Sequence, residues 1–438
     1  MTTPGSQAGV GLEQVTAELD RLLAVADAEL ASGYSGEVAG RQPVHTAYIP
    51  AHRFEPEAIR HWGAQALAAI EEFAPGPGEL ADATGLAPGV AEEVHPLVLA
   101  KLASQPVEDL RIDFEDGYGA RGDETEDAHA RAAARSLAAA RSLAAVLREE
   151  TAPPFCGVRC KSLEQATRRR AVRTIEVFLD ALLENDRPLP GGFVITLPKV
   201  TSAAQVSAMA LLCERMEAAF GVRRPRWLVF EIQVETPQVI LGADGAATIA
   251  RCVHAAPGRL TGLAYGTYDY SAALGIPAAC QSLDHPAADH AKAVMQVAAA
   301  GTGVRLSDGS TNILPVGSRD DVVAAWRLHA RLVRRSLERG FCQGWDLHPA
   351  QLVSRYAAAY GFYREGRANA CDRLSAYAAR SASAQEEPAT ARALAAFLSR
   401  GLDCGALTDP EIATQTGLSP DELRFVRRRG IMPTRSPP

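Results

Sequence analysis

Polar side chains able to do acid–base or ligand-binding chemistry recur along this chain, each shortly after or within a short apolar segment. In chain order they are Asp113, Glu115 and Asp116, then Arg159 and Lys161, Lys199, Glu235, Asp269, and finally Asp346 and His348. Carboxylates can hold a hard cation or transfer protons, and Arg or Lys can bind an anionic substrate. This regular placement predicts that the apolar segments position one shared site.

The apolar segments alternate with Ala-rich stretches of helical periodicity, a pattern typical of parallel β/α units. Strands are predicted over residues 44–50, 109–116, 155–160, 192–200, 227–236, 260–270, 303–314 and 341–347. Helices are predicted near 55–72, 124–148, 164–185, 202–220, 243–254, 286–300, 319–339 and 349–364. Eight strands indicate an α/β fold, the (β/α)8 TIM barrel, whose active site forms at the C-terminal ends of its strands.

Three regions are predicted along the chain. Residues 1–40 are interpreted as a helical leader, 41–370 as the barrel and catalytic domain, and 385–438 as a small all-helical C-terminal appendage. Gly, Pro and Ala clusters over 70–105 indicate an insertion after the first barrel helix.

Glu235 and Asp269 are separated by about one β/α unit, so they are predicted to lie side by side at the ends of neighbouring strands. Two carboxylates completed by water and substrate oxygens are ligands that Mg2+ or Mn2+ prefers. The alternative is that both side chains are solvated at the barrel rim or paired with arginines.

Arg159 alternates with Val158 and Cys160, which predicts that its side chain faces the barrel axis. It would bind an anionic substrate there, or form an internal salt bridge with Glu115 or Glu235. Lys199 could form a Schiff base, but we favour a structural or substrate-binding role because a metal already supplies an electron sink.

Six motifs carry a family resemblance. In order they are DFEDG, GVRCKS, LPKV, QVETPQVI, AYGTYDYSAALG and GWDLHPAQL, over about residues 44–365. This series resembles the citrate lyase β-subunit and malyl-CoA lyase group of the HpcH/HpaI aldolase superfamily. The resemblance implies a phosphoenolpyruvate/pyruvate-type barrel, Mg2+ on Glu235 and Asp269, a substrate-binding Arg159, and catalytic or supporting carboxylates at Glu115 and Asp116. Asp116 stands where the 2-oxoacid aldolase branch has a His, which favours the lyase branch.

The expected function is that of a metal-dependent carbon–carbon lyase or aldolase. Its substrate would be a 2-oxo or 3-hydroxy acid, or an acyl thioester of one, and the reaction would pass through an enolate. Arg159 would face the oxygen on which charge develops, and Glu115 or Asp116 would transfer protons. The sequence does not separate these two carboxylates, and no segment indicates a site for the nucleotide of CoA.

Composition limits the partners. The formal charge of −7 argues against nucleic acid and anionic lipid, and the chain contains no apolar run of membrane-spanning length. The eight cysteines are scattered, which predicts reduced core residues in a cytoplasmic protein. A homo-oligomer is implied by the resemblance alone.

The segment TDPEIATQTGLSPDELRFVRRRG near the C-terminus has the helix–turn–helix pattern of a regulator. Over 401–438, however, acidic residues balance arginines, which is not the basic face that phosphate contacts require. A metabolite-sensing or accessory barrel is therefore the alternative function.

Overall fold

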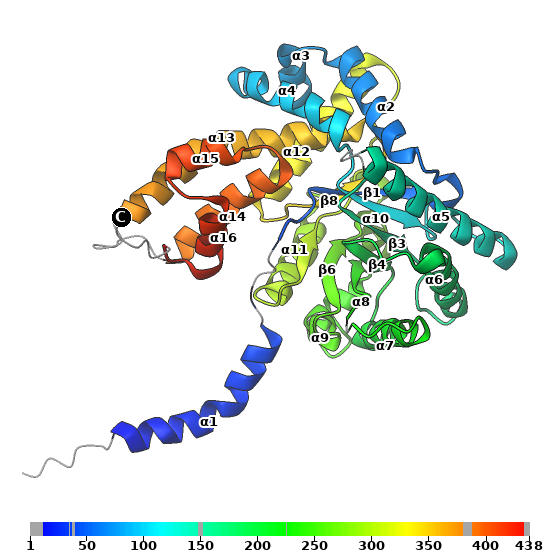
Figure 1. The fold of residues 1–438 in the computed structure, drawn as a ribbon, viewed down its shortest axis with the longest axis vertical. Helices are drawn as coiled ribbons and strands as arrows, with labels where there is room; N and C mark the ends of the chain where they lie inside the picture. Colours follow the sequence, from blue (N-terminus) through cyan, green and yellow to red (C-terminus); the bar gives the residue numbers. More distant parts are fainter. Residues whose placement is uncertain are drawn as a thin grey trace, which may run out of the picture.

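A computed structural model of the chain describes residues 12–34, 36, 40–147, 152–224, 226–379 and 388–432. Its centre is an eight-stranded parallel sheet in the order β7-β6-β5-β4-β3-β2-β1-β8. A parallel bridge between Ser307 and Gln343 joins the two outer strands of that order, so the sheet curves into a (β/α)8 barrel (Figure 1). The predicted fold class is confirmed.

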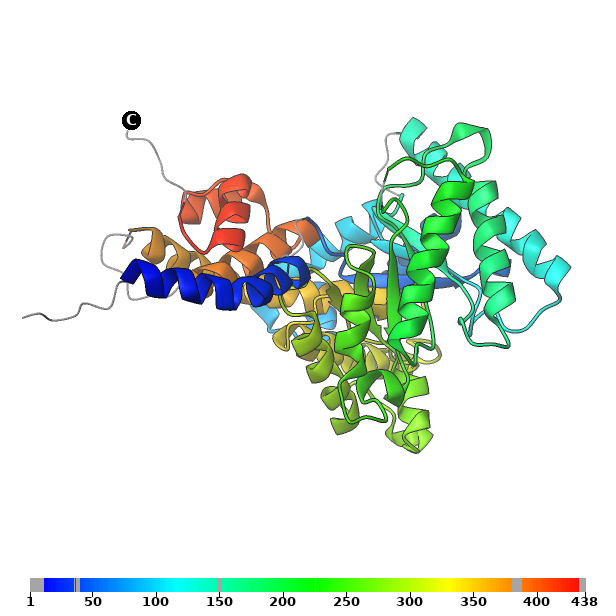
Figure 2. The ribbon, with the colours of Figure 1, turned by 90° about the horizontal axis from the view of Figure 1, so that it is seen from below.

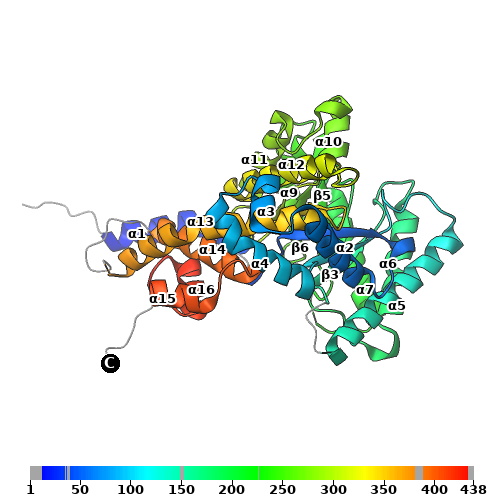
Figure 3. The same ribbon diagram turned by 90° about the horizontal axis from the view of Figure 1, so that it is seen from above.

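The strands are short and close to their predicted positions. They are β1 (His45–Pro50), β2 (Asp109–Asp113), β3 (Phe155–Arg159), β4 (Phe193–Leu197), β5 (Phe230–Val234), β6 (Leu260–Tyr265), β7 (Arg305–Ser307) and β8 (Gly344–Asp346). The helices that alternate with them are α2 (Ala58–Phe73), α5 (Asp123–Leu147), α6 (Arg168–Leu182), α7 (Ala203–Ala219), α9 (Thr248–Ala255), α11 (Pro286–Ala299), α12 (Arg319–Glu338) and α13 (Gln351–Ala379). Figure 3 shows them arranged around the strands.

Alternation along the strands separates two buried layers. In β2, Leu110 and Ile112 lie in the main apolar core between strands and helices. Arg111 between them points into the barrel, where its Nε donates to Thr196 Oγ1 at 2.9 Å and to Glu231 Oε1 at 3.1 Å. Pairing of this kind is what makes buried charge tolerable.

The predicted strands are all longer than the observed ones, as the sixth and the seventh illustrate. The sixth strand ends at Tyr265, and the residues after Gly266 turn at once into helix α10 (Thr267–Ala273). The seventh covers only Arg305–Ser307, because the polar residues after it form a loop. The consequence is that Asp269 lies in the first turn of α10 and not at the end of a strand.

The predicted insertion at 70–105 folds into two further helices, α3 (Pro77–Thr84) and α4 (Pro88–Ser104), which pack against α12 and α13. Short helical segments also occur in the loops: α8 (Pro237–Ile240), η1 (Ala51–Arg53), η2 (Glu184–Asp186) and η3 (Ala278–Cys280). The cysteines are unpaired and mostly buried, but Cys280 is exposed, so it is not the core residue predicted.

The described part of the chain is helical near both of its ends. Helix α1 (Leu12–Gly33) projects away from the barrel and has no buried residue (Figures 1 and 2). Helices α14 (Pro388–Cys404), α15 (Asp409–Thr416) and α16 (Pro420–Arg429) pack beside α13, and Leu398 and Val426 belong to the same apolar cluster as the barrel. A domain boundary near 385 falls outside the described residues and stays a prediction. No helix in the described ranges combines the length and apolarity needed to cross a bilayer.

Candidate active site

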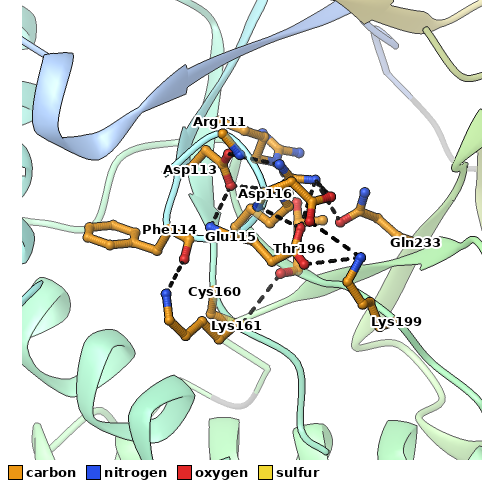
Figure 4. A network of polar contacts seen from close by, with 12 residues as sticks. Arg111, Asp113, Phe114, Glu115, Asp116, Cys160, Lys161, Thr196, Lys199 and Gln233 are labelled. Carbon is orange, nitrogen blue, oxygen red and sulfur yellow. Dashed lines mark hydrogen bonds and ion pairs between the residues drawn. The ribbon is translucent and has the colours of Figure 1, made fainter. Parts of the chain in front are cut away.

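The predicted site residues meet at the C-terminal ends of β2 to β6. Figure 4 shows Glu115, Asp116 and Lys199 close together in this region. Glu115, Asp116, Arg159, Lys199 and Asp269 are joined by ion pairs, and Glu235 accepts a hydrogen bond from the backbone of Lys199. The residues predicted from spacing and resemblance are therefore close neighbours. Lys161 and His348 lie outside this cluster.

Arg159 is buried and held rigidly. Its Nε and Nη2 donate to the two carboxylate oxygens of Asp113 at 2.7 and 2.8 Å, and its guanidinium lies over the Tyr48 ring, 4.8 Å from the centroid. Its Nη1 lies 3.4 Å from both Glu115 Oε2 and Gln233 Oε1. Burial opposes the charge, but Asp113 and then Glu115 raise the pKa of Arg159 well above its usual value. The predicted internal partner was Glu115 or Glu235, whereas the main partner is Asp113.

Asp113 also shapes the DFEDG turn that carries Glu115. Its carboxylate accepts the backbone N–H groups of Glu115 and Gly117, both at 2.9 Å. A Cβ on Gly117 would lie 2.8 Å from Asp113 Oδ2, so the turn needs glycine here. From outside the site, Lys161 Nζ donates to the carbonyl of Phe114 at 2.7 Å and pairs with Glu126 at 3.0 Å. Lys161 therefore supports the turn.

Glu115 and Asp116 have opposite electrostatic environments. The Glu115 side chain is 9% exposed, and its burial raises the pKa despite the attraction of Arg159; the neighbouring Asp116 raises it further. The Asp116 side chain is 55% exposed. Burial of Asp116 opposes its charge, yet its hydrogen bond with Glu115 and the charges of Arg159 and Lys199 lower its pKa. Glu115 is therefore suited to donate a proton, and Asp116 is held as an ionised carboxylate.

Lys199 links both sides of the site. Its Nζ lies 2.8 Å from Asp269 Oδ2, 3.2 Å from Glu115 Oε1 and 3.4 Å from Asp116 Oδ1. Its backbone has a φ of 52°, a conformation that non-glycine residues rarely adopt, and this turns its N–H toward Glu235 Oε1 at 2.6 Å. Burial works against the ammonium, but Glu235, Asp269 and Glu115 raise the pKa of Lys199 above its usual value.

Glu235 directly follows β5 and is 3% exposed. Burial raises its pKa to about 7, although Lys199 and Arg159 lower it in part. Its side chain lies against Gly266, where a Cβ would collide with it, so glycine is needed between β6 and α10. Asp269 lies in the first turn of α10 and is about half exposed. Lys199 contacts both residues, because its backbone N–H donates to Glu235 and its Nζ pairs with Asp269.

The donor chemistry fits a divalent cation. Within the described ranges, no group of three or more His, Cys, Asp or Glu side chains is arranged as a complete metal site. Glu235 and Asp269 nevertheless present two carboxylates, and hard cations commonly take the rest of their oxygen ligands from water and substrate. The raised pKa of Glu235 indicates a buried carboxylate with too little positive charge beside it, which a cation would correct.

Several residues that build the site were missed or misjudged from sequence. Tyr48 and Gln233 were not singled out, and Asp113 was not recognised as the partner of Arg159. Their position along the strands could have revealed Asp113 and Gln233. Like Arg159, both alternate with apolar residues near the C-terminal ends of their strands and so point into the barrel.

The chain matches the family described as Domain of unknown function (DUF6986) over residues 23–431, and it belongs to that family. Among solved structures, a citrate lyase from Burkholderia xenovorans LB400 is similar, with 20% identity and a TM-score of 0.54 over 87% of this chain and 98% of that chain. The likeness shows a shared fold, as the resemblance to the citrate lyase group predicted. No curated protein matches the sequence.

Two further solved structures are similar at lower TM-scores. Malate synthase from Haloferax volcanii, in a complex with magnesium and glyoxylate, has 12% identity and a TM-score of 0.48, over 74% of this chain and 76% of that chain. The CitE protein of Mycobacterium tuberculosis, in complex with magnesium and pyruvate, has 20% identity and a TM-score of 0.42, over 73% of this chain and 91% of that chain.

Proposed function

We propose that this protein is a cytoplasmic, homo-oligomeric, metal-dependent lyase or aldolase that makes or breaks a carbon–carbon bond next to a carboxylate. Its substrate would be a 2-oxo or 3-hydroxy acid or the acyl thioester of one. The observation that carries the proposal is the placement of Arg159 and Lys199 among five carboxylates at the active-site end of the barrel. Arg159 and Lys199 would bind the anionic substrate. The carboxylates, which outnumber them, would hold a metal ion and transfer protons.

Glu235 and Asp269 would hold Mg2+ or Mn2+. A bound divalent cation would supply a Lewis acid to the oxygens of the substrate. Asp269 is half exposed and pairs with the flexible end of Lys199, so it can exchange that partner at little cost. Glu235 is fixed by the backbone of Lys199 and by Gly266, which gives the site one rigid ligand.

Arg159 would bind the oxygen on which negative charge develops. Its Nε and Nη2 are committed to Asp113, and the longer 3.4 Å contacts of Nη1 are weak enough for a substrate oxygen to replace. Because Asp113 and the Tyr48 ring hold the guanidinium before substrate arrives, no reorganisation is needed as the enolate forms. This is the preorganisation that lowers a barrier.

Asp116 and Glu115 would carry out the proton transfers. The lowered pKa of Asp116 keeps it an ionised carboxylate that can accept a proton from an exposed position, whereas Glu115 has the raised pKa expected of an acid. Cleavage requires a proton to leave the hydroxyl group and another to reach the enolate carbon. The two adjacent carboxyl groups would supply these two steps.

Lys199 would bind substrate and position Glu235. Its raised pKa keeps it an ammonium, which is not a nucleophile, so covalent Schiff-base catalysis is disfavoured. In the bound state its Nζ would turn from Asp269 to a carboxylate of the substrate. Its strained backbone is what aims the N–H at Glu235.

The test is exchange of deuterium at the carbon next to the carbonyl, measured by NMR on a panel of 2-oxo acids and acyl-CoA thioesters with Mg2+ or Mn2+. At least one compound should exchange, and EDTA or Glu235→Gln should stop the exchange. Asp244→Asn changes an exposed carboxylate paired with Arg251 and is the matched control. Exchange that survives both EDTA and Glu235→Gln would contradict the proposal.

The alternative is a metabolite-sensing or accessory barrel. In its favour, Gly417 joins α15 to α16 in a left-handed turn of the kind found in helix–turn–helix units. Against it, α16 begins with Asp421 and Glu422. A barrel that binds a 2-oxo acid tightly but never exchanges its protons would favour this alternative.

A further inference from the structure

A second cavity lies at the opposite end of the barrel from the candidate active site. Its volume is about 460 Å³, within the usual range of small-molecule sites. Pro43, just before β1, and Asp109 and Phe155, at the starts of β2 and β3, line it, which places it at the N-terminal mouth. Nothing in the proposed reaction uses this cavity.

Besides Arg111, which pairs with Asp109 and Glu231, three arginines line this cavity: Arg224, Arg226 and Arg305. Among the described residues, none of the three forms a hydrogen bond or ion pair with a carboxylate. Arg305 instead lies over the Phe155 ring, 5.6 Å from its centroid, and the guanidinium of Arg226 lies against Gly258.

The two carboxylates within the cavity, Asp109 and Glu231, already have one cation between them. Asp109 and Glu231 both pair with Arg111, and Thr196 donates to Glu231 Oε1 at 2.6 Å. This ion-paired layer forms the floor of the cavity and crosses the barrel interior between the cavity and Arg159. The two ends of the barrel are thus separate sites. The cavity at the N-terminal mouth has an excess of positive charge.

Arg305 differs from the other arginines whose pKa is shifted in the described part of the chain. The buried Arg111 and Arg159 have raised pKa values because carboxylates outweigh their burial. The pKa of Arg305 is lowered, since burial dominates and the attraction of Asp109 does not offset it; Arg427 lowers it further. A partly buried cation without a partner is costly, and a bound anion would remove that cost.

We propose that this cavity binds a small organic polyanion, a di- or tricarboxylate or an organic phosphate, through Arg224, Arg226 and Arg305. The guanidinium groups can donate paired hydrogen bonds to carboxylate or phosphate oxygens. Phe155, Trp227 and Leu263 supply an apolar wall for the carbon skeleton. The binding is independent of the metal and of the proposed reaction.

Titration calorimetry in EDTA tests this, with citrate as the carboxylate probe and glucose 6-phosphate as the phosphate probe. At least one probe should bind the full-length protein. Arg305→Gln and Arg226→Gln should each weaken binding about 10- to 100-fold, the loss expected for a charged hydrogen-bond donor. Arg223→Gln changes a neighbouring exposed arginine that does not line the cavity and should change affinity by less than about twofold.

Two further measurements complete the test. Circular dichroism must show that each variant is folded. Glu235→Gln should leave probe binding unchanged, because that residue lies at the other end of the barrel. The proposal is overturned if neither probe binds at about 10 mM, a level beyond weak metabolite affinity. It is equally overturned if Arg223→Gln weakens binding as much as Arg305→Gln, since the effect is then non-specific charge.

Discussion

At the upper end of the barrel, where the strands end, five carboxylates surround Arg159 and Lys199. At the lower end, where the strands begin, four arginines line a cavity, and one of them, Arg111, pairs with both carboxylates of that cavity. The upper end is dense with hydrogen bonds, whereas at the lower end Arg224, Arg226 and Arg305 have no carboxylate partner among the described residues. Both ends lie on the same strands and share one apolar core. The difference shows that charge balance, and not burial alone, distinguishes what each end can bind.

The largest expected effect is on catalysis at the upper end. In Arg159→Lys, a point ammonium cannot keep both the Asp113 pair and a substrate contact, so turnover should fall about 100- to 1000-fold. Kinetic measurements with a compound that exchanges deuterium should show kcat falling more than KM rises. A change in KM alone would mean that Arg159 binds only the ground state of the substrate.

The next effect concerns the excess negative charge of the upper end. The pKa of Glu235 is about 7 in the fold against 4.5 for the unperturbed group, so the folded state binds this proton more tightly than the unfolded state does. Without metal, stability should therefore fall as pH rises from 4.5 through 7, and stay reduced above. Glu235→Gln removes this penalty and should stabilise the metal-free protein by about 1 to 3 kcal/mol at pH 8.

Denaturant unfolding in EDTA at pH 5 and pH 8 measures this difference. The stabilisation by Glu235→Gln should be present at the higher pH and nearly absent at the lower one. Equal effects at both values would show that Glu235 is not a strained carboxylate, and the contrast between the two ends of the barrel would lose its main support.

A smaller effect is expected where the backbone approaches Glu235. Gly266→Ala would force a methyl group into the Glu235 side chain and should cost about 1 to 3 kcal/mol of unfolding free energy and weaken metal binding. Gly122→Ala, where a Cβ meets open space, is the matched control. Equal melting temperatures for the two variants would show that Glu235 can move freely.

The smallest effect should appear at the lower end. Arg305 has no carboxylate partner within the described part of the chain, so Arg305→Gln should leave the ligand-free protein as stable as the wild type or up to about 1 kcal/mol more stable. Thermal melting in a buffer without polyanions measures it. A clear loss of stability would mean that Arg305 has an internal partner. The charge pairing at the two ends of the barrel would then be similar.

Much of this organisation was predictable from sequence. Eight apolar segments alternating with segments of helical periodicity predicted the barrel, and the position of polar residues after strands predicted that Glu115, Arg159 and Lys199 would meet. The start of α10 was missed because AYGTYDY is apolar and aromatic enough to continue a strand, while the break depends on Gly266 accommodating Glu235.

Other features depend on contacts that no local pattern encodes. The pairing of Arg159 with Asp113 requires the register in which these two residues stand opposite each other on β2 and β3. The left-handed backbone of Lys199 has no glycine or asparagine to signal it. The cavity at the lower end gathers arginines from the segments before β5 and at β7, which are far apart in sequence.

The most direct test of the central claim is calorimetric titration of Mg2+ and Mn2+ into the metal-free protein. We expect one site per chain, lost in Glu235→Gln and in Asp269→Asn while circular dichroism remains unchanged, and retained in Asp244→Asn. Unchanged metal affinity in both site variants, or no binding by the wild type, would contradict a metal-dependent reaction at this end of the barrel.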